Sequence, residues 1–245
     1  MQELDQLRAL ANPELAERMA ARHKSGRETL GLTPAQIEAA VTGWREGLDL
    51  DGRVALARQL WDSNIHEARL AAPRLLVQAR IPQDDAVWAA ILDWSAKMDG
   101  PDITDAVTTA ASRRVVAHPE RMDVMLDWAQ SSSPWLRRAA LMATLPWAKM
   151  NNPKPEDVDI RERVLDWTLH LADDSNGAVR QAIETWLRDL AKRAPERVAE
   201  WRSTRAADVA GALALRAEAE PTAENPAADS APRDQQAPSD PDQDL

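Results

Sequence analysis

A short phrase occurs four times in this chain, each time where a helix is expected to begin. It consists of an apolar residue, two variable residues and an alanine, and a turn that carries leucine follows. The four copies span residues 68–71, 103–106, 136–139 and 179–182, and their second positions lie 35, 33 and 43 residues apart. Self-similarity at a period of about 40 residues is typical of stacked helix pairs of the HEAT type. In such a stack each unit buries its apolar face only against its neighbours.

The rest of the pattern agrees with an all-α fold. Apolar residues recur with the helical period throughout, and runs that alternate like strands are nearly absent. We therefore predict a HEAT-like helical-repeat solenoid with a concave groove. The expected helices cover residues 2–11, 13–22, 33–48, 51–61, 65–80, 84–97, 101–116, 119–129, 133–145, 157–171, 176–193 and 195–201. Pro73 and Pro146 should kink or end their helices, because proline lacks the backbone donor and clashes with the preceding turn.

The C-terminal part has a different composition. From about Leu215 the chain is rich in Ala, Pro, Glu, Asp, Gln and Ser and has almost nothing apolar to bury. We predict a solenoid domain at residues 1–212 and a disordered acidic tail at 213–245. The net charge of −10 comes largely from nine acids and two bases after Arg205, so the body is nearly balanced. It is not the strongly basic domain that non-specific phosphate binding would suggest.

Several classes of protein are disfavoured. The absence of cysteine excludes disulfides and thiolate chemistry. The four histidines, His23, His66, His118 and His170, are scattered without ligand-like spacing, so no metal site and no cofactor are expected. The N-terminus has no signal-peptide pattern and no run of about 18 apolar residues exists, which indicates a cytoplasmic protein, without a membrane segment, expected to be a monomer.

The third slot of the repeated phrase points to a site. It holds Leu70, Asp105, Arg138 and Gln181, and equivalent positions of stacked helices line up along one face. A carboxylate and a guanidinium in adjacent repeats are the best candidates for function. The alternative for Asp105 is structural, because it lies with Asp102 in a first helical turn, where acids favour the helix dipole. For Arg138 the alternative to a functional role is that of an exposed arginine on the face between repeats.

Five segments resemble the bacterial AlkD-like DNA alkylation repair family of HEAT-like glycosylases. They are residues 60–69, 98–105, 135–141 and 182–189 and the Pro-rich loop at 146–157. The resemblance covers roughly residues 5–202. It implies a protein that removes cationic N3- or N7-alkylated purines from duplex DNA lying on the concave face.

The resemblance also implies roles for individual residues. The catalytic aspartate of the family falls on Asp105, where a carboxylate would stabilise positive charge on the sugar. The groove arginine falls on Arg138, which would bind a phosphate with two donors. Two tryptophans that flank the lesion's deoxyribose in the family fall on Pro101 and Thr185, so both are replaced here. Trp186 is a candidate for a displaced aromatic, although one residue along a helix is a rotation of about 100°.

Further cations complete the predicted set of DNA-binding residues: Arg137, Lys149 and Lys154. Arg69, Arg137 and Arg180 share the second slot of the phrase, and arginines repeated in this way commonly pair with acids of the neighbouring unit. His66 and Glu67 are adjacent and do not share a helix face, so we expect them to be structural. Two functions stay open: an alkylpurine glycosylase, and a non-catalytic scaffold or DNA-binding protein that has lost excision.

Overall fold

The computed structural model describes residues 1–219 and divides the chain into two units, Met1–Ser203 and Thr204–Leu245. The first unit is built from helices joined by short connections, and the described residues contain no strand. The elements are α1 (Gln2–Ala9), α2 (Pro13–His23), α3 (Pro34–Glu46), α4 (Leu50–Asp62), α5 (His66–Leu75), α6 (Asp85–Ser95), α7 (Pro101–Ala117), the 3-10 turn η1 (Pro119–Arg121), α8 (Met122–Ala129), α9 (Pro134–Ala143), α10 (Leu145–Lys149), α11 (Pro155–His170), α12 (Gly177–Ala191) and α13 (Pro195–Ala219).

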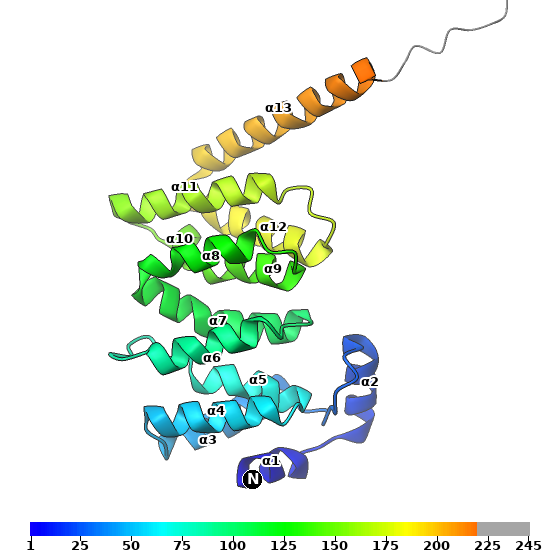
Figure 1. Cartoon of the computed structure of the whole chain (residues 1–245), viewed down its shortest axis with the longest axis vertical. Coiled ribbons are helices and arrows are strands. Elements are labelled where there is room, and N and C mark those ends of the chain that lie inside the picture. Colours follow the sequence, from blue (N-terminus) through cyan, green and yellow to red (C-terminus); the bar gives the residue numbers. More distant parts are fainter. Residues whose placement is uncertain (220–245) are drawn as a thin grey trace, which may run out of the picture. The chain divides into compact units, whose positions relative to one another are not determined.

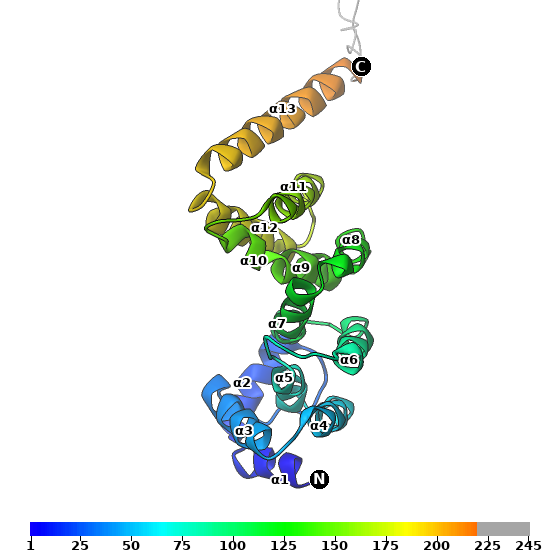
Figure 2. The same cartoon turned by 90° about the vertical axis from the view of Figure 1, so that its left-hand side faces the viewer.

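Within Met1–Ser203 the helices form two rows, which Figure 2 shows nearly end-on. The inner row contains α3, α5, α7, α9 and α12, and each of these helices packs on the next. The outer row contains α4, α6, α8 and α11, which lie along the other side of the stack (Figure 1). Neighbouring units thus cover each other's apolar faces, and the predicted all-α repeat solenoid is confirmed.

The repeated phrase marks the inner row. Its four copies lie at the starts of α5, α7, α9 and α12. The alanines of its fourth slot, Ala71, Ala106, Ala139 and Ala182, are 0, 8, 0 and 0 % exposed. Alanine is needed at these positions because only a small side chain lets neighbouring helices approach closely. The sequence period and the packing of the inner helices therefore agree.

Some helix ends differ from the prediction. Helix α5 continues through Pro73 but ends at Leu75, before the expected Arg80. Pro146 lies in the first turn of the short helix α10, just after α9 ends at Ala143, as the prediction of a break there requires. Helix α13 continues to Ala219, beyond both its expected end at 201 and the expected domain boundary at 212. The remainder of the predicted tail, residues 220–245, lies outside the described residues.

A buried carboxylate anchors the loop between α2 and α3. Glu67, at the start of α5, is 0 % exposed and accepts hydrogen bonds from the backbone N–H groups of Leu30, Gly31 and Leu32 at 2.9, 2.8 and 3.3 Å. Its structural role, expected from the sequence, is confirmed. None of the helices in the described part of the chain has the length and apolarity that crossing a membrane requires.

Candidate functional site

Asp105 and Arg138 meet between adjacent repeats. The Nε and Nη2 groups of Arg138 donate to Oδ1 and Oδ2 of Asp105 at 2.9 and 3.0 Å. The Nη1 group donates to the carbonyl of Ala178, the second residue of α12, at 2.9 Å. One guanidinium thereby links α7, α9 and α12, and it fixes the orientation of the carboxylate through two parallel bonds.

The two partners differ in accessibility. The side chain of Arg138 is 9 % exposed, whereas that of Asp105 is 49 % exposed. A carboxylate offers about four lone-pair positions, so two bonds from Arg138 leave acceptor capacity on the outer side of Asp105. The three bonds of Arg138 engage three of its five N–H groups, so the phosphate contact predicted for it would have to use the other two.

Asp105 lies between two hollows of the inner row. The first, of about 670 Å³, is lined by α2, α3, α5 and α7 and includes Arg22, Arg45 and Arg74. The second, of about 630 Å³, is lined by α7, α9 and α10 and includes Arg113 and Lys149. Asp105 and Thr109 line both, so the two hollows adjoin at this face of α7. We call them the N-terminal hollow and the C-terminal hollow.

The arginines in the second slot of the phrase are held by structural contacts. Arg137 donates to Asp174 through Nε at 2.6 Å and Nη2 at 3.0 Å, and its Nη1 donates to the carbonyls of Ser131 and Ser132. Arg69 lies over the ring of Trp61 and bonds its carbonyl, and Arg180 bonds the carbonyl of Asp174. Pairing with an acid of the neighbouring unit is thus observed for Arg137, where the contacts engage all three side-chain nitrogens. Arg69 and Arg180 are held instead by backbone carbonyls and, for Arg69, by an aromatic ring.

The two lysines of the Pro-rich loop have different positions. Lys149 ends α10, lines the C-terminal hollow, and has its Nζ 3.5 Å from Oδ2 of Asp189. Lys154 is 76 % exposed, with its Nζ 3.9 Å from Glu156, and does not line either hollow. Of the two, only Lys149 is close to the face that carries Asp105.

The positions expected to flank a lesion lie on two different helices, α7 and α12. Pro101 is the exposed first residue of α7, where proline is well accommodated, and Thr185 is half-buried on α12. The prediction that Trp186 is a displaced aromatic of the groove is wrong. Its side chain is 0 % exposed in the core, because the next residue along a helix points about 100° away.

A smaller cavity beside Pro101 holds residues that sequence reasoning did not bring together. It measures about 230 Å³ and is lined, among others, by His23, His66 and Trp135. Burial, together with the nearby His23 and Arg27, lowers the pKa of His66 to about 4, so this imidazole is neutral at neutral pH. Histidines far apart in the chain carried no signal of this meeting, because it depends on how α2 and α5 pack.

The comparisons with known proteins come from a family profile and from solved structures. The profile described as DNA alkylation repair enzyme matches residues 4–218. No curated protein matches the chain significantly.

Solved structures share the fold at low identity. A structure described as a predicted DNA alkylation repair enzyme from Enterococcus faecalis has a TM-score of 0.63 at 17% identity, and the match covers 79% of this chain and 89% of that one. A structure described as AlkD2 from Streptococcus mutans has a TM-score of 0.54 at 18% identity, with 75% and 86% covered. At sequence identities this low, the structural similarity shows a shared fold and nothing about activity.

Proposed function

The chain belongs to the DNA alkylation repair enzyme family, and from this we propose that it is a glycosylase that removes cationic N3- and N7-alkylated purines from duplex DNA. The observation that supports this most is the state of Asp105. Its carboxylate is held by two bonds from Arg138 yet is half exposed between two hollows of the inner row.

The chemistry suits a fixed carboxylate. In a cationic alkylpurine the C1′–N bond breaks with its electron pair going to the base, which leaves as a neutral molecule. Positive charge develops on the sugar, and the charge of Asp105 would stabilise it without a reorganisation of the site. Water then adds to C1′ and releases a proton. Arg138 acts as a positioning residue, because it keeps both carboxylate oxygens in one orientation.

The surroundings of Asp105 suit an anionic polymer. Arg22, Arg45 and Arg74 line the N-terminal hollow and outnumber the two further acids there, Glu38 and Asp102. Arg113 and Lys149 line the C-terminal hollow. These cations lie on both sides of Asp105, where the phosphates that flank a lesion would pass. Duplex DNA along the inner row is therefore the proposed substrate, while a cytoplasmic location and a monomeric state stay predictions.

The decisive test is release of 7-methylguanine from alkylated duplex DNA. The wild type should release the base, and Asp105→Asn should abolish release while DNA binding changes much less, because the amide keeps the size but not the charge. Asp93→Asn is the matched control, since Asp93 on the outer helix α6 also pairs with an arginine, Arg58, at 2.9 Å. Wild-type release that persists in Asp105→Asn would contradict the proposed mechanism.

One observation favours the second function, DNA binding without excision. The positions of the family's sugar-flanking tryptophans hold Pro101 and Thr185, which have no aromatic face. A variant carrying Pro101→Trp and Thr185→Trp separates the two functions. If the protein is a glycosylase, this variant should excise faster than the wild type. If neither protein excises although both are folded and bind DNA, the DNA-binding function stands and the glycosylase proposal fails.

A further inference from the structure

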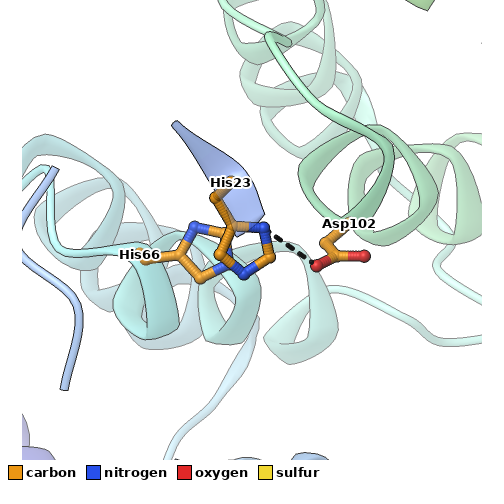
Figure 3. A group of neighbouring side chains, drawn as sticks. All are labelled: His23, His66 and Asp102. Carbon is orange, nitrogen blue, oxygen red and sulfur yellow. Dashed lines mark ion pairs between the residues drawn. The ribbon is translucent and has the colours of Figure 1, made fainter. Parts of the chain in front are cut away.

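Three potential metal ligands from three separate helices meet beside Pro101. His23 ends α2, His66 begins α5, and Asp102 is the second residue of α7. One ligand atom from each side chain lies within 4.8 Å of the others. Figure 3 shows the two imidazoles one over the other, with Asp102 next to His23. All three residues line the cavity of about 230 Å³, which leaves room for an ion and water.

The imidazoles lack the partners that buried polar groups normally have. His66 is 2 % exposed, and neither of its ring nitrogens has a hydrogen-bond partner among the described residues. The Nε2 atom of His23 is also buried and unpartnered, while its Nδ1 lies 3.4 Å from Asp102. Leaving a buried polar atom unsatisfied is energetically costly, so such groups usually indicate a ligand or another role.

We propose that His23, His66 and Asp102 bind a divalent transition-metal ion, with Zn²⁺ as the best fit. Two imidazole nitrogens and one carboxylate oxygen are a ligand set that zinc accepts, with water in the remaining position. Mg²⁺ and Ca²⁺ prefer sites made of oxygen atoms, so the two imidazoles select against them. The ion would connect α2, α5 and α7, three elements that are far apart in sequence.

Coordination requires a limited movement of the side chains. The two rings are stacked with centroids 4.0 Å apart and an angle of 26° between their planes. Because the lone pair of an imidazole nitrogen lies in the ring plane, stacked rings do not aim at one point. Rotation of His23 about its side-chain bonds is the smaller change, since it lies at a helix end and is less buried than His66.

Two nearby arginines influence the charge of the site. Arg22 is 71 % exposed and donates to Oδ2 of Asp102 at 2.8 Å. Arg27 is buried and pairs with Asp99, so its charge is balanced locally. Arg22 thus competes with a metal ion for the same carboxylate oxygen, and its exposed side chain can move into solvent when an ion binds.

Calorimetric titration of the full-length protein with Zn²⁺ tests the site directly. The wild type should bind one ion per chain, and Mg²⁺ should give no comparable heat. His23→Gln, His66→Gln and Asp102→Asn should each weaken Zn²⁺ binding by about tenfold or more, since loss even of outer-shell partners costs that much. Co²⁺ provides a second readout, because its visible absorption depends on the ligand geometry.

His170→Gln is the matched control. His170 also lies next to an acid, with its Nδ1 3.6 Å from Asp166, but it is 75 % exposed and far along the chain on α11. It should leave Zn²⁺ binding unchanged. The proposal is overturned if the wild type binds no ion, if His170→Gln weakens binding as much as the other variants, or if folded His23→Gln and Asp102→Asn bind as well as the wild type. Thermal unfolding without metal verifies that each variant is folded.

Arg22→Gln gives a prediction of opposite sign. Removing the competing cation should tighten Zn²⁺ binding several-fold, which a site elsewhere on the surface would not show. Weaker or equal binding by this variant would count against the assignment of Asp102 as a ligand. The titration measures metal binding in the absence of DNA, so its result does not depend on the proposed glycosylase activity. Either proposal can therefore fail without the other.

Discussion

At the scale of single residues, the pair of Asp105 and Arg138 combines rigidity with access. Arg138 is nearly buried and makes three bonds, so its position is determined by α7, α9 and α12 together. The two bonds from Arg138 hold the Asp105 carboxylate in one orientation, although its side chain is 49 % exposed and lines both hollows. A carboxylate held in this way needs no reorganisation when positive charge appears nearby, which is the condition for strong electrostatic stabilisation.

Substituting Arg138→Lys should therefore lower excision more than it lowers DNA binding. A lysine ammonium keeps the charge but cannot hold both carboxylate oxygens in parallel, because it lacks the planar fork of a guanidinium. We expect a reduction in the single-turnover excision rate of about tenfold or more, in line with the cost of a small misplacement of a catalytic group. Single-turnover kinetics and binding by fluorescence anisotropy measure the two effects separately.

Arg58→Lys is the control for this substitution, since Arg58 is an exposed arginine that pairs with Asp93 on the outer row. It should leave both quantities unchanged. A loss of excision that merely follows a loss of binding in Arg138→Lys would show that Arg138 acts by contacting DNA, and not by positioning Asp105.

Asp174 provides a prediction about pH. Burial raises the pKa of this carboxyl, but the hydrogen bonds from Arg137 and from the Asn176 amide outweigh it and hold the pKa below its ordinary value. A depressed native pKa stabilises the fold above the unfolded value of about 3.9 and loses that effect as the pH falls further. Asp174→Asn should cost about 1–3 kcal/mol at pH 7, and the difference from wild type should shrink between pH 4 and pH 3.

Urea unfolding of wild type and Asp174→Asn over this pH range measures the effect. Asp166→Asn is the control, because Asp166 is 65 % exposed and should change stability by less than about 0.5 kcal/mol at any pH. A stability difference for Asp174→Asn that stays constant down to pH 3 would contradict the role of its charge.

The residues of the candidate site were predictable to different degrees. Asp105 and Arg138 follow from the repeat, because equivalent slots of stacked helices must become neighbours. Their bidentate bond was not predicted, since it depends on side-chain conformation and on a carbonyl of α12. The meeting of His23 and His66 was also missed, because two residues on different helices reveal a contact only after the helices are packed.

At the scale of secondary-structure elements, the inner row depends on small residues at its helix contacts. Ala139 is 0 % exposed on α9, and α9 packs on both α7 and α12. Ala139→Arg should destabilise the fold by at least about 1–3 kcal/mol, because the added side chain has no space and no partner. For a unit of this size, each kcal/mol corresponds to a change in Tm of about 2–4 °C.

Thermal unfolding compares this variant with Ala39→Arg, which places the same side chain at an exposed position of α3. The control should have a Tm close to that of the wild type. If Ala139→Arg melts at the wild-type temperature, the alignment of the four repeats is wrong at α9.

Helix ends were less predictable than helix interiors. Helix α5 tolerates Pro73 and stops two residues later, where Leu76 turns out of the helix. Gly31, with a positive φ of 78°, is also required for a reason outside its own segment, because a Cβ there would collide with the backbone of Asn12 and Ala16. Such features are set by tertiary contacts, which a periodic pattern of apolar residues does not contain.

At the scale of the whole molecule, the net charge of the chain does not show where the cationic side chains lie. The formal net charge is −10, yet arginines and a lysine line the hollows on both sides of Asp105. Binding of a polyanion depends on the local arrangement of charge and not on the sum over the chain. The acidity of the whole chain therefore does not conflict with the proposal that DNA binds along the inner row.

Charge reversal on the two rows tests which face binds DNA. The double substitution Arg113→Glu and Lys149→Glu alters the C-terminal hollow, which both side chains line together with Asp105 and where both are largely exposed. It should weaken binding of duplex DNA by about tenfold or more and lower the salt slope by about one for each phosphate that these side chains no longer bind.

Arg163→Glu is the control, because Arg163 is 43 % exposed on the outer helix α11. Fluorescence anisotropy at several salt concentrations gives both quantities. If the outer-row control weakens binding as much as the inner-row variant, DNA does not bind along the inner row, and Asp105 cannot be the group that meets the lesion.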